Sequence, residues 1–200
     1  SLGKDGSIDP TATGSLGMPE AIDSADLLVV QLRFRAWNDA TMRRFVNAYL
    51  RGVPIVALRT STHAFAYPKD STSEFKKYSH DSREWPSGFG KQVLGETWVN
   101  HHGHHKVEAT RGVIEKANAS HAILRGVTDV FGDTDVYEAH PPADCTVLLR
   151  GQVLQGMKPD DAPVEGKKNE PMQAIAWTRE PTNASGKTNK VFVTTMGAAT

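Results

Sequence analysis

A cluster of histidines is the strongest chemical signal in this sequence. Half of the chain's eight histidines fall within five positions, as His101, His102, His104 and His105. Imidazole is the commonest side-chain ligand of transition metals in proteins. On a strand His102 and His104 would share a face, whereas a helix would group His101, His104 and His105, and Gly103 disfavours a helix interior. We predict that His102, His104 and His105 could bind a divalent transition metal such as zinc.

The histidine cluster also has a simpler interpretation. A carboxylate would complete a metal site, and Glu96, Asp135 and Glu138 are available for it. The sequence has no HExxH or similarly spaced motif, however. The cluster could therefore be a polar loop whose imidazoles form hydrogen bonds with the backbone or with a substrate, and the sequence leaves both interpretations open.

Three arginines follow two apolar segments and could bind a ligand. Arg33 and Arg35 come after the apolar run 26–32, and Arg59 comes directly after the run 54–58. A guanidinium group is suited to bidentate recognition of a carboxylate and to hydrogen bonds with sugar hydroxyls. Arg33 and Arg35 could instead pair with acidic side chains on the surface. Arg59 is the strongest candidate, because it follows a segment that reads as a buried strand.

Other residues could join these groups in one site. His63, four residues after Arg59, could act as a general base or simply pack against neighbouring aromatic rings. Asp135 and Tyr137, two positions apart, would point to the same face of a strand. We predict three catalytic residues and five substrate-binding residues. The catalytic candidates are His63, His102 and Asp135; the substrate-binding candidates are Arg33, Arg35, Arg59, Trp37 and Tyr137. Trp37, Trp98 and Tyr137 could stack on a sugar ring, although aromatic side chains more often belong to the core.

The elements that must position these residues begin with a strand, a helix and a strand. Residues 26–32 and 54–58 are short apolar runs, typical of strands buried on both faces. Between them, Asn38 and Asp39 offer N-cap chemistry, an apolar stripe follows at helical spacing, and Gly52 stands where a helix would end. This order predicts a parallel βαβ unit, in which ligands bind beyond the carboxyl ends of the strands.

The rest of the chain is predicted to form a long loop followed by short strands. Residues 60–95 are predicted to form a long loop over the crevice, with a short helix at 89–94 that ends at Gly95. From residue 100 onward the sequence favours short strands, with a brief apolar patch at 122–124. The best strand candidates are 135–138, 146–149, 173–178 and 190–195.

Composition excludes several classes of protein. The 200 residues carry 23 basic and 23 acidic side chains, so no net charge attracts the chain to nucleic acid. No segment approaches the roughly 18 apolar residues of a membrane span. The single Cys145 rules out an intrachain disulfide and a zinc site built from several cysteines. We expect a soluble chain that binds a small molecule. The sequence leaves open a cytoplasmic or exported location and the formation of homo-oligomers.

Several segments, taken in order, resemble a known family. Residues 54–61 sit like the strand and nucleophile elbow of class I glutamine amidotransferases, and residues 22–200 resemble the ThuA-like (trehalose utilisation) branch of that fold. The supporting segments are His121-Ala122-Ile123-Leu124, Thr134-Asp135-Val136-Tyr137, 171–177 and 186–192. The resemblance implies a flavodoxin-like, three-layer α/β sandwich with a mainly parallel central sheet. It also implies that residues 1–200 are a single domain, and a fragment that lacks the first strand and the last helix of the full fold.

Departures from the family pattern limit the chemistry that the resemblance implies. Arg59 stands where a glutaminase needs its cysteine, and Cys145 lies far along the chain, so we do not expect a functional glutaminase. The ThuA-like histidines are also replaced, at Arg59 and at Ala198. The resemblance implies action on, or binding of, a sugar or sugar derivative at the carboxyl edge of the sheet, by hydrolase or lyase chemistry if the chain is an enzyme. The alternative is a non-catalytic carbohydrate-binding or accessory domain.

Overall fold

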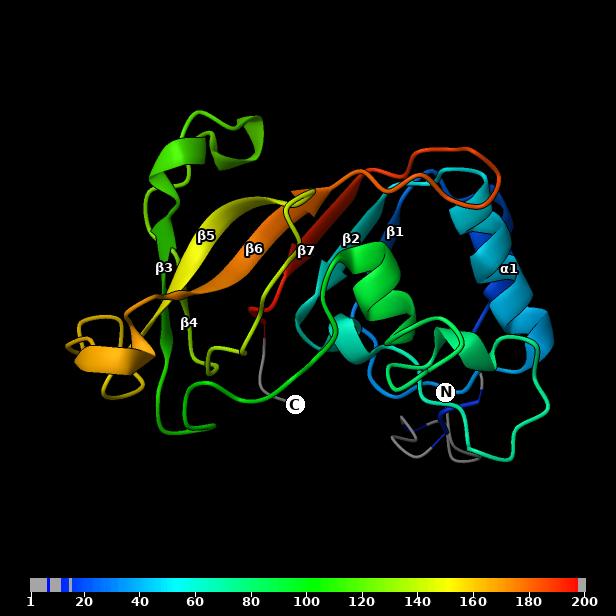
Figure 1. Cartoon of the computed structure of the whole chain (residues 1–200), viewed down its shortest axis with the longest axis horizontal. Coiled ribbons are helices and arrows are strands. Elements are labelled where there is room, and N and C mark those ends of the chain that lie inside the picture. The colour runs from blue at the N-terminus through cyan, green and yellow to red at the C-terminus, as the bar shows by residue number, and fades with distance from the viewer. Residues whose placement is uncertain (1–6, 8–11, 15, 198–200) are drawn as a thin grey trace.

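The strands form one mixed sheet in the computed structural model, which describes residue 7, residues 12–14 and residues 16–197. The sheet has seven strands among these described residues, in the order β1-β2-β7-β6-β5-β3-β4 (Figure 1). Their bounds are β1 Leu28–Val30, β2 Ile55–Leu58, β3 Thr110–Ile114, β4 Phe131–Gly132, β5 Thr146–Val153, β6 Gln173–Arg179 and β7 Val191–Thr194.

The prediction of a mainly parallel, three-layer sandwich is wrong. Only the β1–β2 and β2–β7 pairs are parallel, whereas β7–β6, β6–β5, β5–β3 and β3–β4 are antiparallel. The sheet curls, and the helical segments between residues 19 and 94 gather beside β1, β2 and β7, whereas those at residues 116–124 and 166–168 lie near the β3–β4 end of the sheet (Figure 1). Parallel neighbours need a long crossover such as a helix, whereas antiparallel strands can be joined by short connections. Beyond residue 100 the described chain has no α-helix to provide such a crossover, so the sheet continues with antiparallel pairs.

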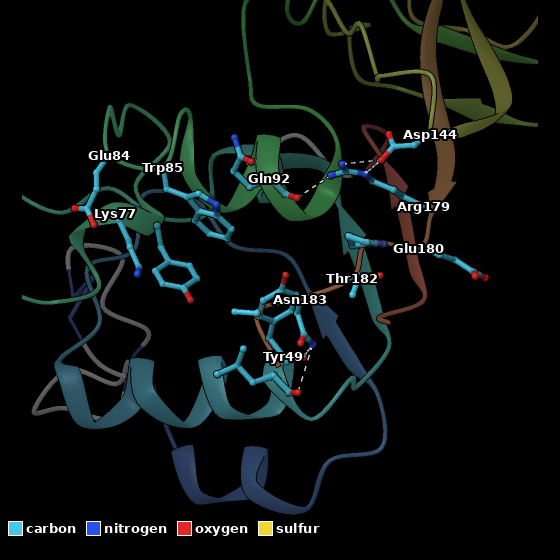
Figure 2. A pocket seen from close by; sticks show the side chains of 14 residues that line it. Tyr49, Lys77, Glu84, Trp85, Gln92, Asp144, Arg179, Glu180, Thr182 and Asn183 are labelled. Atoms are coloured by element: carbon cyan, nitrogen blue, oxygen red, sulfur yellow. Dashed lines mark hydrogen bonds and ion pairs between the residues drawn. The ribbon is translucent and has the colours of Figure 1, made fainter. Parts of the chain in front are cut away.

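The βαβ prediction is confirmed. The helix α1 (Asp39–Leu50) begins after Asn38, whose side chain accepts a hydrogen bond from the backbone N–H of Thr41 at 2.9 Å. The chain then turns at Gly52, whose φ of 87° lies in the left-handed region that glycine adopts readily. Asn183 donates to the backbone oxygen of Tyr49 at 2.8 Å, which satisfies a carbonyl in the last turn (Figure 2).

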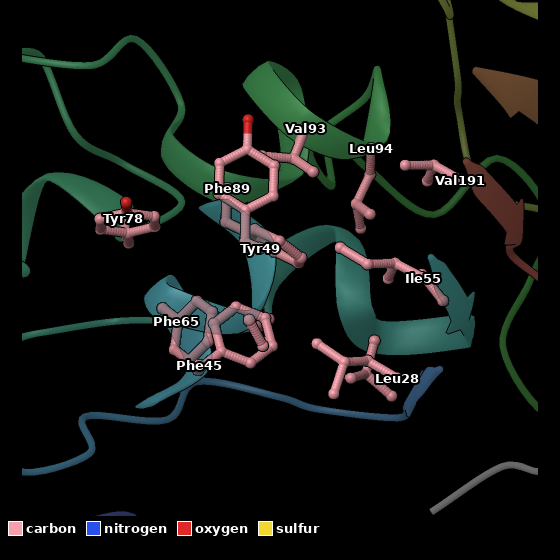
Figure 3. Packing of buried hydrophobic residues seen from close by; sticks show 14 of the residues in the cluster. Leu28, Phe45, Tyr49, Ile55, Phe65, Tyr78, Phe89, Val93, Leu94 and Val191 are labelled. Atoms are coloured by element: carbon pink, nitrogen blue, oxygen red, sulfur yellow. The ribbon is translucent and has the colours of Figure 1, made fainter. Parts of the chain in front are cut away.

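Residues 60–95 contribute to the main hydrophobic core. This segment carries the 3-10 helix η3 (Lys76–Tyr78) and the short helix η4 (Gly90–Leu94), which ends at Gly95 as predicted. Phe65 and Phe89 pack against Phe45 of α1 and against each other, with ring centroids 5.4–5.6 Å apart in the three pairs (Figure 3). Buried aromatic rings of this kind dominate core energetics, so the segment is anchored by its packing.

The remaining elements are short. They are the 3-10 helices η1 (Pro19–Ser24), η2 (Arg59–His63), η5 (Lys116–Asn118), η6 (Ala122–Leu124) and η7 (Gly166–Lys168). The strands predicted at 146–149, 173–178 and 190–195 are present as β5, β6 and β7. Residues 135–138 make one isolated bridge, Tyr137 to His101, instead of the predicted strand. None of the helices in the described part of the chain is long and apolar enough to cross a membrane.

Candidate functional site

Arg59 lies at the turn where β2 ends and η2 begins. Its backbone φ is 40°, an uncommon conformation for a residue other than glycine, and the residue is only 3% exposed. One guanidinium nitrogen, Nη1, donates to the backbone oxygens of Asp135 at 2.7 Å and Thr195 at 2.9 Å. The other, Nη2, contacts the Asp135 carboxylate at 2.8 Å. Arg59 therefore joins the ends of β2 and β7 to the segment that follows β4.

The topology of the sheet brings Asp135 to this edge. Four successive antiparallel pairings lead from β7 to β4, so β4 runs in the same direction as β7, β2 and β1. Asp135 follows β4 by three residues, so it reaches the carboxyl edge of the parallel strands, beside Arg59. Backbone bonds then align the histidine segment with this region: the N–H groups of His102 and Gly103 both donate to Val136, at 2.9 and 3.1 Å.

Two histidines share the Asp135 carboxylate. The Nδ1 atom of His101 lies 2.6 Å from Oδ2, and the Nδ1 atom of His105 lies 2.9 Å from Oδ1. The Asp135 side chain is fully buried, whereas the His101 and His105 side chains are 41% and 39% exposed. An ionised carboxylate only accepts hydrogen bonds, so Nδ1 carries the proton in each ring. Neither Nε2 atom has a hydrogen-bond partner in the described part of the chain.

The protonation of Asp135 follows from its neighbours. Burial acts to raise its pKa, but hydrogen bonds from His101 and His105 and the charge of Arg59 outweigh that effect and hold the pKa below its ordinary value. Asp135 is therefore ionised at neutral pH. An ionised carboxylate at Nδ1 orients an imidazole and stabilises its protonated form, which prepares Nε2 to accept a proton.

Aromatic rings lie beside His101. The Arg59 guanidinium lies 3.9 Å from the centre of the Tyr137 ring, within the range of a cation–π contact. Tyr137 also contacts His101 at 5.4 Å between ring centroids, and Trp98 contacts His101 at 5.6 Å. Trp98 is half-buried and Tyr137 is buried. Trp98 is therefore the more exposed of these two aromatic side chains, and it is the one that a ligand could reach beside His101.

His63 belongs to the same neighbourhood but is electrically neutral. Its ring lies 5.6 Å from Trp98 and 6.3 Å from Tyr137. Burial, reinforced by the positive charges of His80, Arg33 and Arg59, lowers its pKa from 6.5 to about 3. A base with so low a pKa is weak near neutral pH, so His63 is poorly suited to act as a general base there.

The structure separates the predicted metal ligands. His105 lies at Asp135, but the His102 ring points to the backbone oxygen of Lys168, with Nε2 at 2.8 Å. His104 is exposed, and its backbone N–H donates to the Glu108 carboxylate at 2.7 Å. His101, which the sequence grouped with the others only in a helical arrangement, is the second histidine at Asp135. The run of four histidines in the sequence pointed to this region. The bridge between His101 and Tyr137 determines which of the four rings reach Asp135.

The predicted substrate-binding residues are also divided. Arg59 and Tyr137 lie together at Asp135. Arg33 is exposed near Phe34 and close enough to His63 to influence its pKa. Arg35 donates to the backbone oxygen of Ala12 at 3.3 Å, and Trp37 is buried in the core against Phe45 and Phe65. The last two are not placed to contact a ligand at Asp135.

His101, His105 and Asp135 form a cluster that could hold a metal ion. Their candidate ligand atoms all lie within 4.8 Å of one another. Both carboxylate oxygens already accept hydrogen bonds from the imidazoles or from Arg59. A metal held by all three residues would therefore replace some of these hydrogen bonds, and it would have the three protein ligands that are usual in catalytic zinc sites.

Comparison with known proteins adds no family assignment. No protein-family model matches the chain, and no curated protein matches it. The resemblance to the ThuA-like family stays a prediction.

Proposed function

We propose that this chain is an enzyme in which a histidine held by Asp135 removes a proton from a small, neutral, carbohydrate-type ligand or from the water that attacks it. The observation that carries the proposal is the shared carboxylate: Asp135 accepts hydrogen bonds from Nδ1 of both His101 and His105. Each imidazole then presents Nε2, which has no partner among the described residues, to a ligand. This is the arrangement expected of a general base.

The surrounding charges support a neutral ligand. The Arg59 and Asp135 charges cancel, and the Arg59 guanidinium is committed to Asp135 and Thr195. Burial and nearby positive charges keep the pKa of His63 low, so that ring is also uncharged. Trp98 beside His101 offers an aromatic surface on which the C–H face of a sugar ring could stack. Arg59 is a positioning residue in this proposal, because it fixes the carboxylate that holds both bases.

Two assays test the two forms of this reaction. Deuterium exchange tests proton removal from the ligand, and glycoside hydrolysis tests proton removal from the attacking water. The protein would be incubated in D₂O with D-fructose, D-xylulose and 1,5-anhydro-D-fructose, and exchange of the hydrogen next to the carbonyl would be followed by NMR. Nitrophenyl glucosides of both anomeric forms would test hydrolysis. We expect turnover that falls by about 100-fold or more in His101→Gln/His105→Gln, the range typical for loss of a general base.

A matched variant makes the test specific. The control is His102→Gln/His104→Gln, which removes two histidines from the same loop that lie outside the Asp135 cluster. Equal loss of activity in both variants would contradict the assigned base. Ligand binding without any exchange or hydrolysis would instead favour the alternative, a non-catalytic carbohydrate-binding or accessory domain.

A metal-assisted form of the reaction is a second candidate, favoured by the closeness of His101, His105 and Asp135. A divalent transition metal such as zinc would be held by one ligand atom from each of His101, His105 and Asp135. Such an ion lowers the pKa of bound water. Elemental mass spectrometry of tag-free protein tests this form. Near-stoichiometric metal that is lost in His101→Gln/His105→Gln but kept in His102→Gln/His104→Gln would support it, and metal-free active protein would exclude it.

A further inference from the structure

A cavity lies at the end of the parallel strands opposite to the Asp135 cluster. It has a volume of about 530 Å³ and is bordered by α1, residues 77–85, η4 and the chain that leaves β6 (Figure 2). Arg179, one of its lining residues, pairs with Val191, the first residue of β7. Arg59 instead contacts Thr195, just beyond the last residue of β7. The cavity and the Asp135 cluster are therefore separate sites.

Aromatic side chains with unsatisfied polar groups line this cavity. Tyr49 and Tyr78 are only 6% and 7% exposed, and neither hydroxyl has a hydrogen-bond partner within the described ranges. Trp85 packs edge-on against Tyr78 with ring centroids 5.0 Å apart, and its indole N–H is likewise unpaired among those residues. These three groups are therefore donors at the cavity wall that no described residue occupies, and they could bind a ligand that supplies acceptors.

The tyrosine hydroxyls are available as donors across the physiological range. Burial raises the pKa of Tyr78 to about 12 and also raises the pKa of Tyr49. Both phenols therefore stay protonated and neutral. A phenol can donate one hydrogen bond and accept others, which suits the hydroxyl groups of a ligand.

The charged groups of the cavity are of both signs, and only some of them are paired. The Arg179 guanidinium contacts the Asp144 carboxylate at 2.8 Å and donates to the backbone oxygen of Gln92 at 2.7 Å. Asn183 is occupied by the backbone oxygen of Tyr49 and by the Asn189 side chain, at 2.8 and 2.9 Å. The lining also carries Lys77, Glu84 and Glu180, which form no ion pair among the described residues, so charges of both signs border the cavity and could form hydrogen bonds with the hydroxyl groups of a neutral ligand.

We propose that this cavity, here called the tyrosine pocket, binds a neutral, hydroxylated ring compound such as a mono- or disaccharide unit. Its volume lies within the roughly 300–1,000 Å³ typical of small-molecule sites. The Trp85 and tyrosine rings would contact the apolar C–H face of the sugar, while the phenol and indole donors would bind its oxygens. The tyrosine pocket does not depend on catalysis at Asp135, so this inference stands apart from the proposed function.

NMR titration with D-glucose, maltose and indole tests the inference. The indole N–H signal of Trp85, assigned with a Trp85→Phe variant, reports on occupancy of the pocket. We expect maltose or glucose to shift this signal, and we expect the affinity to fall at least about tenfold in Tyr49→Phe/Tyr78→Phe, which loses two hydrogen-bonding hydroxyls and keeps both rings.

Two control variants test whether a change in sugar affinity is specific to the tyrosine pocket. Tyr67→Phe removes a phenol whose partner is the backbone oxygen of Trp37, so it should leave the affinity unchanged. His101→Gln/His105→Gln should also leave it unchanged, whatever its effect on turnover. Three results would overturn the inference: no shift of Trp85 with either sugar, full affinity in Tyr49→Phe/Tyr78→Phe, or tighter binding of indole than of the sugars.

Discussion

Arg59 and Asp135, separated by 76 positions in the sequence, form an ion pair in which the side chains are 3% and 0% exposed. Their 2.8 Å contact is reinforced by the bonds from Arg59 to the backbone oxygens of Asp135 and Thr195. The pair fixes the carboxylate that holds His101 and His105. It also ties the end of β2 to the segment after β4, so it serves both the fold and the candidate site.

Removing the Arg59 charge should strongly destabilise the protein. Arg59→Met leaves the Asp135 carboxylate buried with only the two imidazoles as partners, and breaking a buried ion pair in this way typically costs about 3–5 kcal/mol. Chemical denaturation would measure the change in the free energy of unfolding. Arg43→Met is the control, because Arg43 pairs with Glu74 where both side chains are more than half exposed, and such pairs contribute about 0–1 kcal/mol. Similar losses in the two variants would contradict the buried role of Arg59.

The neutral state of His63 should make stability depend on pH. Burial lowers its pKa from 6.5 to about 3 in the folded protein, so between these values the unfolded chain binds the proton more readily. The resulting stabilisation is fully present above pH 6.5 and is lost as the pH falls toward 3. In His63→Phe, which cannot titrate, the free energy of unfolding should decline less steeply over this range, as measured by urea denaturation at a series of pH values. An equally steep decline in both proteins would contradict the assignment.

Gly90 tests the contact between η4 and η2. A Cβ atom at this position would lie 2.0 Å from the backbone oxygen of Thr62, so one of the two segments must move. We expect Gly90→Ala to destabilise the protein by about 1–3 kcal/mol, the usual cost of overpacking, and to disturb the NMR signals of the adjacent His63. Gly17→Ala is the control, because a Cβ atom there meets nothing within 4 Å. Unchanged thermal stability in Gly90→Ala would show that η4 does not pack against η2 as described.

Local signals in the sequence predicted the first part of the fold. Asn38 as a cap, Gly52 after the helix and Gly95 after η4 act through their own backbone and a few neighbouring residues, so their types alone indicate the elements. In the antiparallel half the sequence predicted the strands β5, β6 and β7, but it predicted neither β3 nor the pairing of the strands. In β3, Gly112 breaks the apolar alternation because the side chain of Val130 approaches it closely: a Cβ atom at Gly112 would lie 2.7 Å from Val130. That approach is a long-range property of the sheet.

The candidate site was only partly predictable for the same reason. The sequence indicated that Arg59, Asp135 and Tyr137 could meet at one edge of the sheet. Asp135 and Tyr137 are two positions apart, which is the side-chain period of a strand, and Arg59 directly follows a buried strand. The sequence could not indicate which of the four neighbouring histidines reach Asp135. That choice depends on the bridge between His101 and Tyr137, which sets the register of the loop, and on backbone bonds from His102 and Gly103 to Val136.

Glu108 should control that register from the other end of the loop. Its carboxylate accepts bonds from Lys168 at 2.6 and 2.7 Å and from the backbone N–H of His104 at 2.7 Å, which fixes the turn between His101 and His105. In Glu108→Ala we expect His105 to lose its fixed contact with Asp135, so that its neutral ring becomes a mixture of both tautomers.

Nitrogen NMR of the histidine side chains would measure this tautomer mixture at a pH above the histidine titration. Glu115→Ala is the matched control, because Glu115 pairs with Arg150 at the end of β3 and has no contact with the histidine loop. The control should keep the Nδ1-protonated form of His105 that its bond to Asp135 requires. If Glu108→Ala also keeps that single tautomer, then Asp135 alone orients His105 and the Glu108–Lys168 pair has no positioning role.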